Sequence, residues 1–234
     1  MALREYLRWP GGIVRALWHR LPGGPPVHRE QEAGDARDLP DPVPAELLDG
    51  LVQRVADGAG DLLHRRYTVV IDGGRLGPEE LVRRFGEEPN RAVPDVALFV
   101  RTRGAPGPVV PGDEFRVRIP GPWDGPVRTI AVSPTAVRFA TMWGHLEAGQ
   151  IEFRAERASD GAVVFTIESW ARSGDRVSRL LYDRLPLAKE VQLTVWVQTC
   201  LGMAAESGGV PRDGVAVHTR RVPAELVARP PAGV

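Results

Sequence analysis

Apolar and polar residues alternate with the period of a β-strand through the middle of the chain. Phe115, Val117 and Ile119 face one way while Arg116 and Arg118 face the other. Alternating or β-branched runs of this kind predict strands at 67–71, 96–101, 115–119, 127–132, 136–142, 150–155 and 163–170. The last six follow one another without an intervening helix. They therefore predict an antiparallel meander, because parallel neighbours need long crossover connections.

Helical spacing appears on both sides of this meander. Residues 78–85 predict a short helix with a proline in its first turn. A longer segment, from 176 to about 205, repeats apolar residues such as Val195 and Met203 and is apolar on nearly all sides. It is long enough to cover the dry face of a one-sided sheet. We therefore expect it to lie across that face, with Pro186 kinking or dividing it near its start.

The first 65 residues carry mixed signals. Residues 1–20 have the spacing of two short amphipathic helices, with Trp9 and Trp18 beside arginines. Such helices bind a membrane surface or pack on protein, and we favour packing on the same domain or on a second copy. Residues 21–44 are rich in proline and glycine and predict a linker or a strap lying on the surface, and 45–63 return to helical spacing. The predicted organisation is an N-terminal helical arm and linker at 1–65, a main domain at 66–206 and a C-terminal tail at 207–234.

The composition argues against several classes of protein. Lysine and arginine together number 30, as do aspartate and glutamate, so no net charge attracts nucleic acid. Cys200 is the only cysteine, so neither an internal disulfide nor a cysteine-based zinc site can form within one chain. The sequence also lacks an export signal and an apolar run of about 18 residues. We expect a soluble, cytoplasmic protein.

The order of the predicted elements carries a resemblance. Strand, short helix, antiparallel meander and long C-terminal helix resemble the helix-grip fold of the START-like (SRPBCC) superfamily. Lipid-transfer domains, plant allergen-type ligand carriers and aromatic polyketide cyclases belong to that superfamily. The resemblance implies an α+β fold in which a curved antiparallel sheet wraps around a long C-terminal helix, here preceded by the N-terminal helical arm.

A second resemblance is more local. Gly144-His145 and Gly149-Gln150, followed by Phe153, resemble the Gly-His and Gly-Glu signature of an uncharacterised bacterial and plant family within that superfamily. Gln150 stands where that family usually has glutamate. The likeness covers roughly residues 67–205. It implies a fold and a position for a site, and it implies no activity.

His145 and Glu147 are the candidate catalytic pair. Neighbouring glycines permit an unusual backbone, and a carboxylate can orient an imidazole that moves protons near neutral pH. The alternative, which we favour, is structural. His145 and Gln150 would then hydrogen-bond the backbone of the loop between two strands.

Other residues are candidates for lining a ligand site. Glu168 and Arg172 share one face of a strand with Trp170. If that face is interior, the pair binds a polar ligand head; if it is exterior, which we favour, the pair is exposed and stabilises little. Trp123 lies in a rigid proline-glycine loop and is equally a ligand gate or a cap on the core.

Trp143 and Trp196 are expected to line the cavity or the core. The sequence has no glycine-rich phosphate loop, no histidine pair at metal-ligand spacing on a helix and no serine nucleophile elbow. We therefore expect neither a metal nor a cofactor.

Three functional hypotheses follow. The leading one is binding of a hydrophobic small molecule, lipid-like or of the aromatic polyketide kind, between the sheet and the C-terminal helix. The second is a cyclase or dehydratase in which His145 and Glu147 transfer protons. The third is a scaffold that associates with itself or with a membrane surface through residues 1–20.

Overall fold

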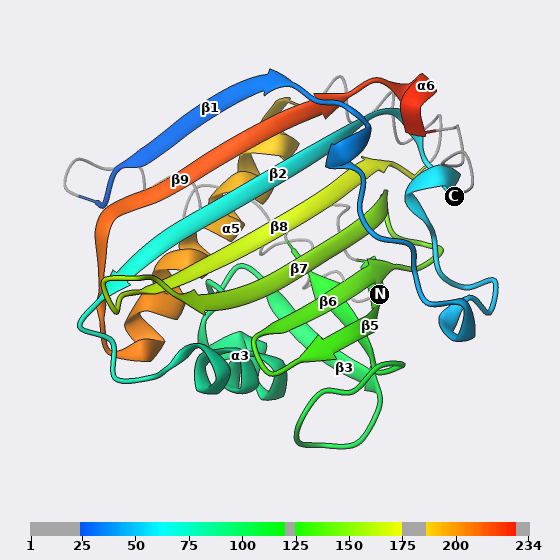
Figure 1. The fold of residues 1–234 in the computed structure, drawn as a ribbon. Helices are drawn as coiled ribbons and strands as arrows, with labels where there is room; N and C mark the ends of the chain where they lie inside the picture. The colour runs from blue at the N-terminus through cyan, green and yellow to red at the C-terminus, as the bar shows by residue number, and fades with distance from the viewer. Residues whose placement is uncertain (1–23, 120–124, 175–185, 228–234) are drawn as a thin grey trace, which may run out of the picture.

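The computed structural model of the chain describes residues 24–119, 125–174 and 186–227. The strands within these residues form one curved sheet of nine, in the order β1-β9-β2-β8-β7-β6-β5-β4-β3 (Figure 1). They are β1 (Val27–Ala33), β2 (Ala59–Asp72), β3 (Leu98–Arg103), β4 (Glu114–Arg118), β5 (Gly125–Ser133), β6 (Ala136–Thr141), β7 (Glu147–Arg157), β8 (Val163–Ser173) and β9 (Val210–Val222). Neighbours run antiparallel except β1 and β9, which are parallel. The predicted antiparallel meander is thus confirmed as β3 to β8.

The helix α5 (Pro186–Ser207) lies against the concave face of the sheet (Figure 1). It begins at Pro186, whose missing N–H is no loss in the first turn of a helix. Val195, Cys200 and Met203 are buried in the main core, as expected for a helix with apolar residues on most sides. The α+β class and the sheet curved around a C-terminal helix agree with the prediction. The predicted helices at 1–20 lie outside the described residues.

Aromatic rings fill the core between β3 to β7 and α5. The Phe139 ring centroid lies 5.7 Å from that of Phe115 and 6.0 Å from that of Phe153, with the rings of both pairs nearly perpendicular. Phe153 also meets Trp196 of α5 edge-on at 5.7 Å. Edge-to-face pairs of this kind add about 0.5–1.5 kcal/mol each beyond the area that they bury. Sheet and helix are therefore joined by a continuous aromatic cluster.

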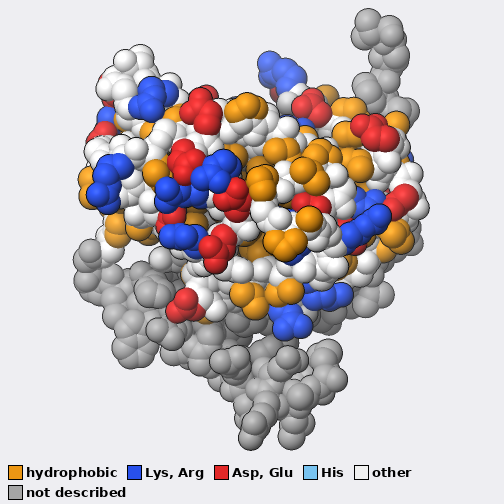
Figure 2. Space-filling view, turned by 90° about the horizontal axis from the view of Figure 1, so that it is seen from below, with side chains coloured by type: hydrophobic (Ala, Val, Ile, Leu, Met, Phe, Trp, Pro, Cys, Tyr) orange, Lys and Arg blue, Asp and Glu red, His pale blue; other side chains and the backbone are white. Residues whose placement is uncertain are grey.

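The short helix α3 (Pro78–Glu87) closes the lower end of the concave face (Figure 1). Its inner side carries the buried residues Leu81, Val82 and Phe85. Its outer side carries ion pairs between Arg83 and both Glu80 and Glu87. Seen from this side, acidic and basic side chains are interspersed with hydrophobic ones (Figure 2). This face is therefore neither predominantly positive nor predominantly negative in charge.

The convex face is covered in part by residues 34–57, which we call the strap. It contains the single 3₁₀ turns η1 (Ala36–Asp38), η2 (Ala45–Leu47) and η3 (Val55–Asp57). Val43 and Val52 of the strap pack on Ile130 and Ala140, and Val55 packs beside Trp170. The middle strands are consequently buried on both faces where the strap crosses them.

Three sequence expectations for secondary structure are wrong. Residues 45–63 are not a helix, because Gly50 and Gly60 take positive φ values of 81° and 82° and β2 begins at Ala59. The predicted linker contains β1, and the predicted tail contains β9, which pairs with β1 on one side and β2 on the other. The sheet therefore extends beyond the predicted main domain at both ends.

No helix in the described part of the chain is long and apolar enough to span a bilayer.

Candidate functional site

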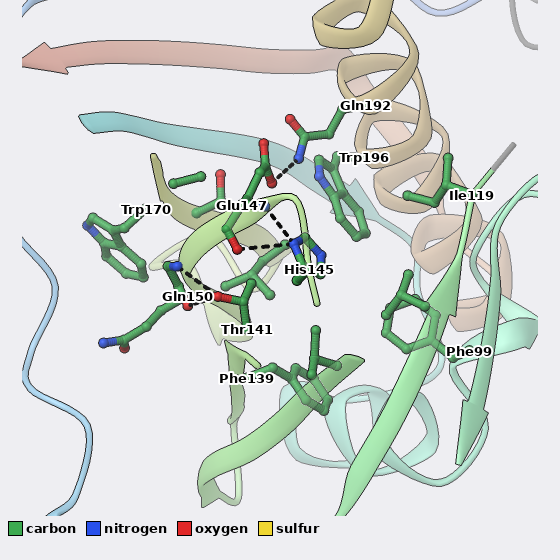
Figure 3. A pocket seen from close by; sticks show the side chains of 16 residues that line it. Phe99, Ile119, Phe139, Thr141, His145, Glu147, Gln150, Trp170, Gln192 and Trp196 are labelled. Carbon is green, nitrogen blue, oxygen red and sulfur yellow. Dashed lines mark hydrogen bonds between the residues drawn. The ribbon is translucent and has the colours of Figure 1, made fainter. Parts of the chain in front are cut away.

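A cavity of about 70 Å³ lies between the concave face of the sheet and α5 (Figure 3). The apolar part of its wall consists of Phe99, Val117, Ile119, Val127, Phe139, Ile151 and Trp196. The polar part consists of Thr141, His145, Glu147, Ser169 and Gln192. The wall thus combines a large apolar region with a small cluster of polar groups, the usual composition of a small-molecule site.

His145 sits in the tight turn between β6 and β7. Gly144 before it has a φ of 99°, a conformation that glycine adopts without the steric cost that a side chain brings. The backbone N–H of Glu147 donates to the imidazole Nδ1 at 2.9 Å. This bond is shorter than the 3.2 Å between Nδ1 and the backbone oxygen of Glu147, so we assign the lone pair to Nδ1 and the proton of the neutral ring to Nε2. The described residues offer Nε2 no hydrogen-bond partner.

Burial lowers the pKa of His145, since a charged imidazolium loses hydration in the cavity wall, and the nearby charge of Glu147 offsets this only in part. His145 is thus neutral at pH 7. Its ring also packs closely on the backbone of Gly125 in β5. A Cβ at Gly125 would lie 2.0 Å from the imidazole Cδ2, so this position accepts no side chain unless the ring moves.

The carboxylate of Glu147 is bound by a residue from the helix. The Gln192 amide donates to Glu147 Oε2 at 2.8 Å, and Arg65 of β2 donates to the Gln192 amide oxygen at 3.1 Å. The imidazole of His145 hydrogen-bonds the backbone of Glu147 and not its carboxylate. The predicted arrangement, in which the carboxylate orients the imidazole, is therefore not the one observed.

Trp196 carries a polar group without a partner. The residue is 6% exposed, and its indole Nε1 has no hydrogen bond among the described residues. Leaving such a donor buried and unpaired costs about 1–3 kcal/mol. Figure 3 shows the indole beside His145 and Glu147 at the polar part of the cavity wall. A residue of the cavity wall therefore holds a buried donor that no described residue binds.

A family model for a domain of unknown function, DUF1990, matches residues 58–200. The chain belongs to this DUF1990 family. The match spans His145, Glu147, Gln192 and Trp196, and it excludes the whole strap and all of β9. None of the curated proteins matches the sequence.

Solved structures resemble this DUF1990 protein only distantly. The di-domain ARO/CYC StfQ from the steffimycin biosynthetic pathway is 11% identical, with a TM-score of 0.46 over 65% of this chain and 51% of StfQ. The chain thus spans about half the length of StfQ. The hypothetical protein jhp0584 from Helicobacter pylori is 11% identical, with a TM-score of 0.43 over 70% of this chain and 94% of that one. Ara h 8.0201 is 12% identical, with a TM-score of 0.35 over 57% of this chain and 98% of that one. No feature of the cavity is inferred from these likenesses.

Gly149 and Gln150, which follow His145 in the sequence signature described above, make structural contacts in this DUF1990 protein. A Cβ at Gly149 would lie 1.8 Å from the carbonyl oxygen of Trp170 on the next strand, so only glycine fits. Gln150 borders the cavity, but its side chain points away and donates to the backbone oxygen of Asp41 in the strap at 2.9 Å (Figure 3). Gln150 therefore hydrogen-bonds the backbone, as in the favoured interpretation, but this backbone belongs to the strap and not to the loop between β6 and β7.

Glu168, Trp170 and Arg172 lie on the convex side of β8, although Trp170 also borders the cavity. They are not exposed there, because the strap covers them, and Glu168 is only 4% exposed. Glu168 and Arg172 do not pair either. Arg172 donates to the backbone oxygens of Gly60 and Val55 at 2.7 and 3.1 Å. The favoured exterior position thus agrees with the structure, whereas the expected exposure and the pairing of Glu168 with Arg172 are wrong.

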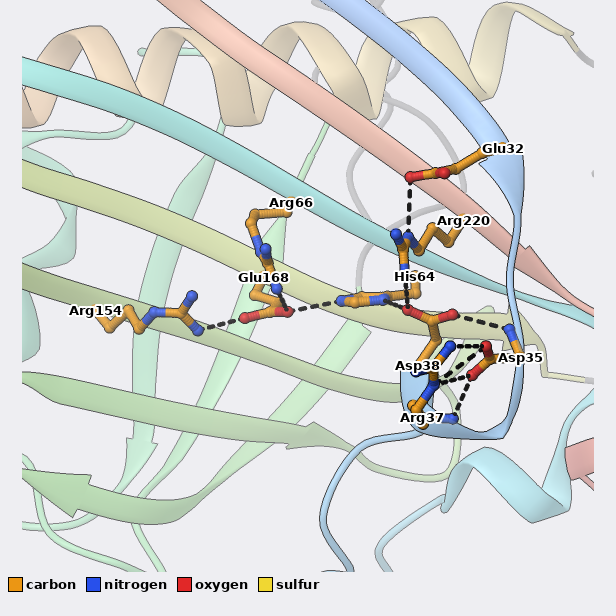
Figure 4. Close-up of polar contacts among 9 residues, drawn as sticks. All are labelled: Glu32, Asp35, Arg37, Asp38, His64, Arg66, Arg154, Glu168 and Arg220. Carbon is orange, nitrogen blue, oxygen red and sulfur yellow. Dashed lines mark hydrogen bonds and ion pairs between the residues drawn. The ribbon is translucent and has the colours of Figure 1, made fainter.

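Glu168 belongs instead to a polar cluster beneath the strap (Figure 4). The His64 ring is held between two carboxylates, with Nδ1 3.0 Å from Asp38 of the strap and Nε2 2.7 Å from Glu168. It also stacks on Trp170 with ring centroids 5.3 Å apart. Arg66 donates to Glu168 at 2.9 Å. This cluster is part of the attachment of the strap and lies outside the cavity.

Of the remaining predicted site residues, some line the cavity and others lie away from it. Trp196 lines the cavity as expected, whereas Trp143 is 53% exposed and does not contact it. Trp123 lies outside the described residues. Sequence reasoning missed Gln192, although an amide between apolar residues on this helix was a usable signal. Among the described residues, no group of acidic, histidine or cysteine side chains is suited to hold a metal.

Proposed function

We propose that this DUF1990 protein binds a small apolar molecule in the cavity between its sheet and α5. The observation that supports this most directly is the buried, unpaired indole N–H of Trp196 in a wall that is mainly apolar. The cavity is about half as large as the roughly 150 Å³ cavity known to hold benzene. The ligand is therefore small, or the walls move apart to admit it.

Toluene tests the proposal, followed by chemical-shift changes in the ¹⁵N–¹H spectrum of the protein. Ala171 lines the cavity, and Ala171→Leu would fill it; Ala131 is exposed on β5, and Ala131→Leu is the matched control. We expect toluene to shift resonances of cavity residues in the wild type and in Ala131→Leu, and to bind at least about tenfold more weakly to Ala171→Leu. Equal binding to both variants, or no binding to the wild type, would refute the proposal.

Acid–base catalysis by His145 and Glu147 has less support. The Glu147 carboxylate is bound by Gln192, and the Nδ1 of His145 is used by the backbone. Of these groups, only the imidazole Nε2 has no hydrogen-bond partner among the described residues. A cyclase or dehydratase function would require His145→Gln to abolish turnover of a matching substrate while the protein remains folded. Unchanged product formation would exclude it.

A further inference from the structure

Two residues that line the cavity, Trp196 and His145, have neutral side chains with an N–H group that no described residue binds. One is the indole Nε1–H of Trp196, which is buried and has no partner among the described residues. The other is the Nε2–H of His145, whose proton position follows from the hydrogen bond that Nδ1 accepts from Glu147. Both residues line the same cavity (Figure 3). A group that binds here must accept hydrogen bonds.

The charges around the cavity limit what that group can be. Among the described residues that line it, Glu147 is the only acidic one, and no arginine or lysine lines it. A carboxylate or phosphate would bring a second negative charge into an apolar cavity next to Glu147. The described wall has no cationic side chain to balance that charge. A neutral acceptor meets no such penalty.

We propose that the cavity selects an uncharged molecule with an apolar body and one carbonyl-type oxygen. That oxygen accepts a hydrogen bond from the indole of Trp196, with the imidazole of His145 as the second donor. A carbonyl oxygen has two lone pairs and can accept both bonds. This inference rests on the proposed function, because it names the class of molecule that the same cavity binds.

The test compares three single-ring compounds of similar size: acetophenone, cumene and benzoate. Acetophenone has the neutral carbonyl, cumene replaces it with carbon, and benzoate is an anion. We expect acetophenone to bind at least about tenfold more tightly than cumene, and benzoate not to bind. Acetophenone should also shift the indole N–H resonance of Trp196, which the Trp196→Phe variant assigns.

Variants separate the two donors from general packing. Trp196→Phe and His145→Phe should each reduce the preference for acetophenone over cumene, while cumene still binds. Trp143→Phe, which changes an exposed tryptophan outside the cavity, should keep the wild-type preference. The inference fails if cumene or benzoate binds the wild type as tightly as acetophenone, or if the preference survives in both donor variants. If none of the three compounds binds, the proposed function itself fails.

Discussion

Replacing Glu168 by glutamine should destabilise the fold without touching the cavity. Burial alone would raise the pKa of Glu168, but hydrogen bonds from His64 and Arg66 and the charge of Arg154 outweigh it and lower that pKa to about 2. The ordinary value is 4.5. A difference of about 2.5 pKa units corresponds to about 3 kcal/mol of folding free energy at neutral pH. Breaking a buried ion pair costs a similar amount.

The sign of this contribution sets its pH dependence. Because the folded-state pKa lies below the unfolded value, the stabilisation is fully present above about pH 5 and is lost as the pH falls toward 2. Glu168→Gln removes the titrating group. The variant should therefore be about 3 kcal/mol less stable than the wild type at pH 7, and the gap should narrow steadily below pH 4.

Urea denaturation followed by circular dichroism at a series of pH values measures both effects. Glu156→Gln is the matched control, because Glu156 is an exposed carboxylate on β7, and its loss should change stability by less than about 0.5 kcal/mol. A loss at Glu168 no larger than that at Glu156 would refute the reasoning. So would a loss that stays constant from pH 7 to pH 3.

Three further outcomes are expected. Gly149→Ala should lower the free energy of unfolding by more than about 2 kcal/mol in chemical denaturation, because a Cβ there meets the carbonyl oxygen of Trp170; stability within error of the wild type would contradict this. Cys200 should resist thiol reagents until urea unfolds the protein, because burial raises the pKa of its thiol, so rapid labelling of the native protein would show that α5 opens. His145 should titrate below its ordinary pKa of 6.5 in an NMR pH series. Its share of the stability is therefore present above pH 6.5 and lost as the pH falls through the folded-state pKa, whereas a midpoint above 6.5 would mean that the ring gains a partner.

Local patterns in the sequence sufficed for the meander and for both helices that flank it. Alternation in β4 places Phe115 and Val117 on the concave face and Arg116 and Arg118 outside. The pattern is clear there because one face of that strand is solvated. In β8 both faces are buried, one by α5 and the other by the strap, so alternation carries no information about which side Glu168 takes.

The sequence by itself determined the class of fold, the strands from β3 to β8 and the helix that covers them, because periodicity and turn residues act over a few neighbouring positions. Only the tertiary structure decided which polar groups meet. Gln192 binds Glu147 across 45 positions of sequence, and Asp38 meets His64 across 26. The same holds for β1 and β9, whose pairing brings together segments about 190 residues apart, too far for any local pattern to record. Contacts of this kind depend on how the whole sheet closes around α5, and the cavity is formed by that closure.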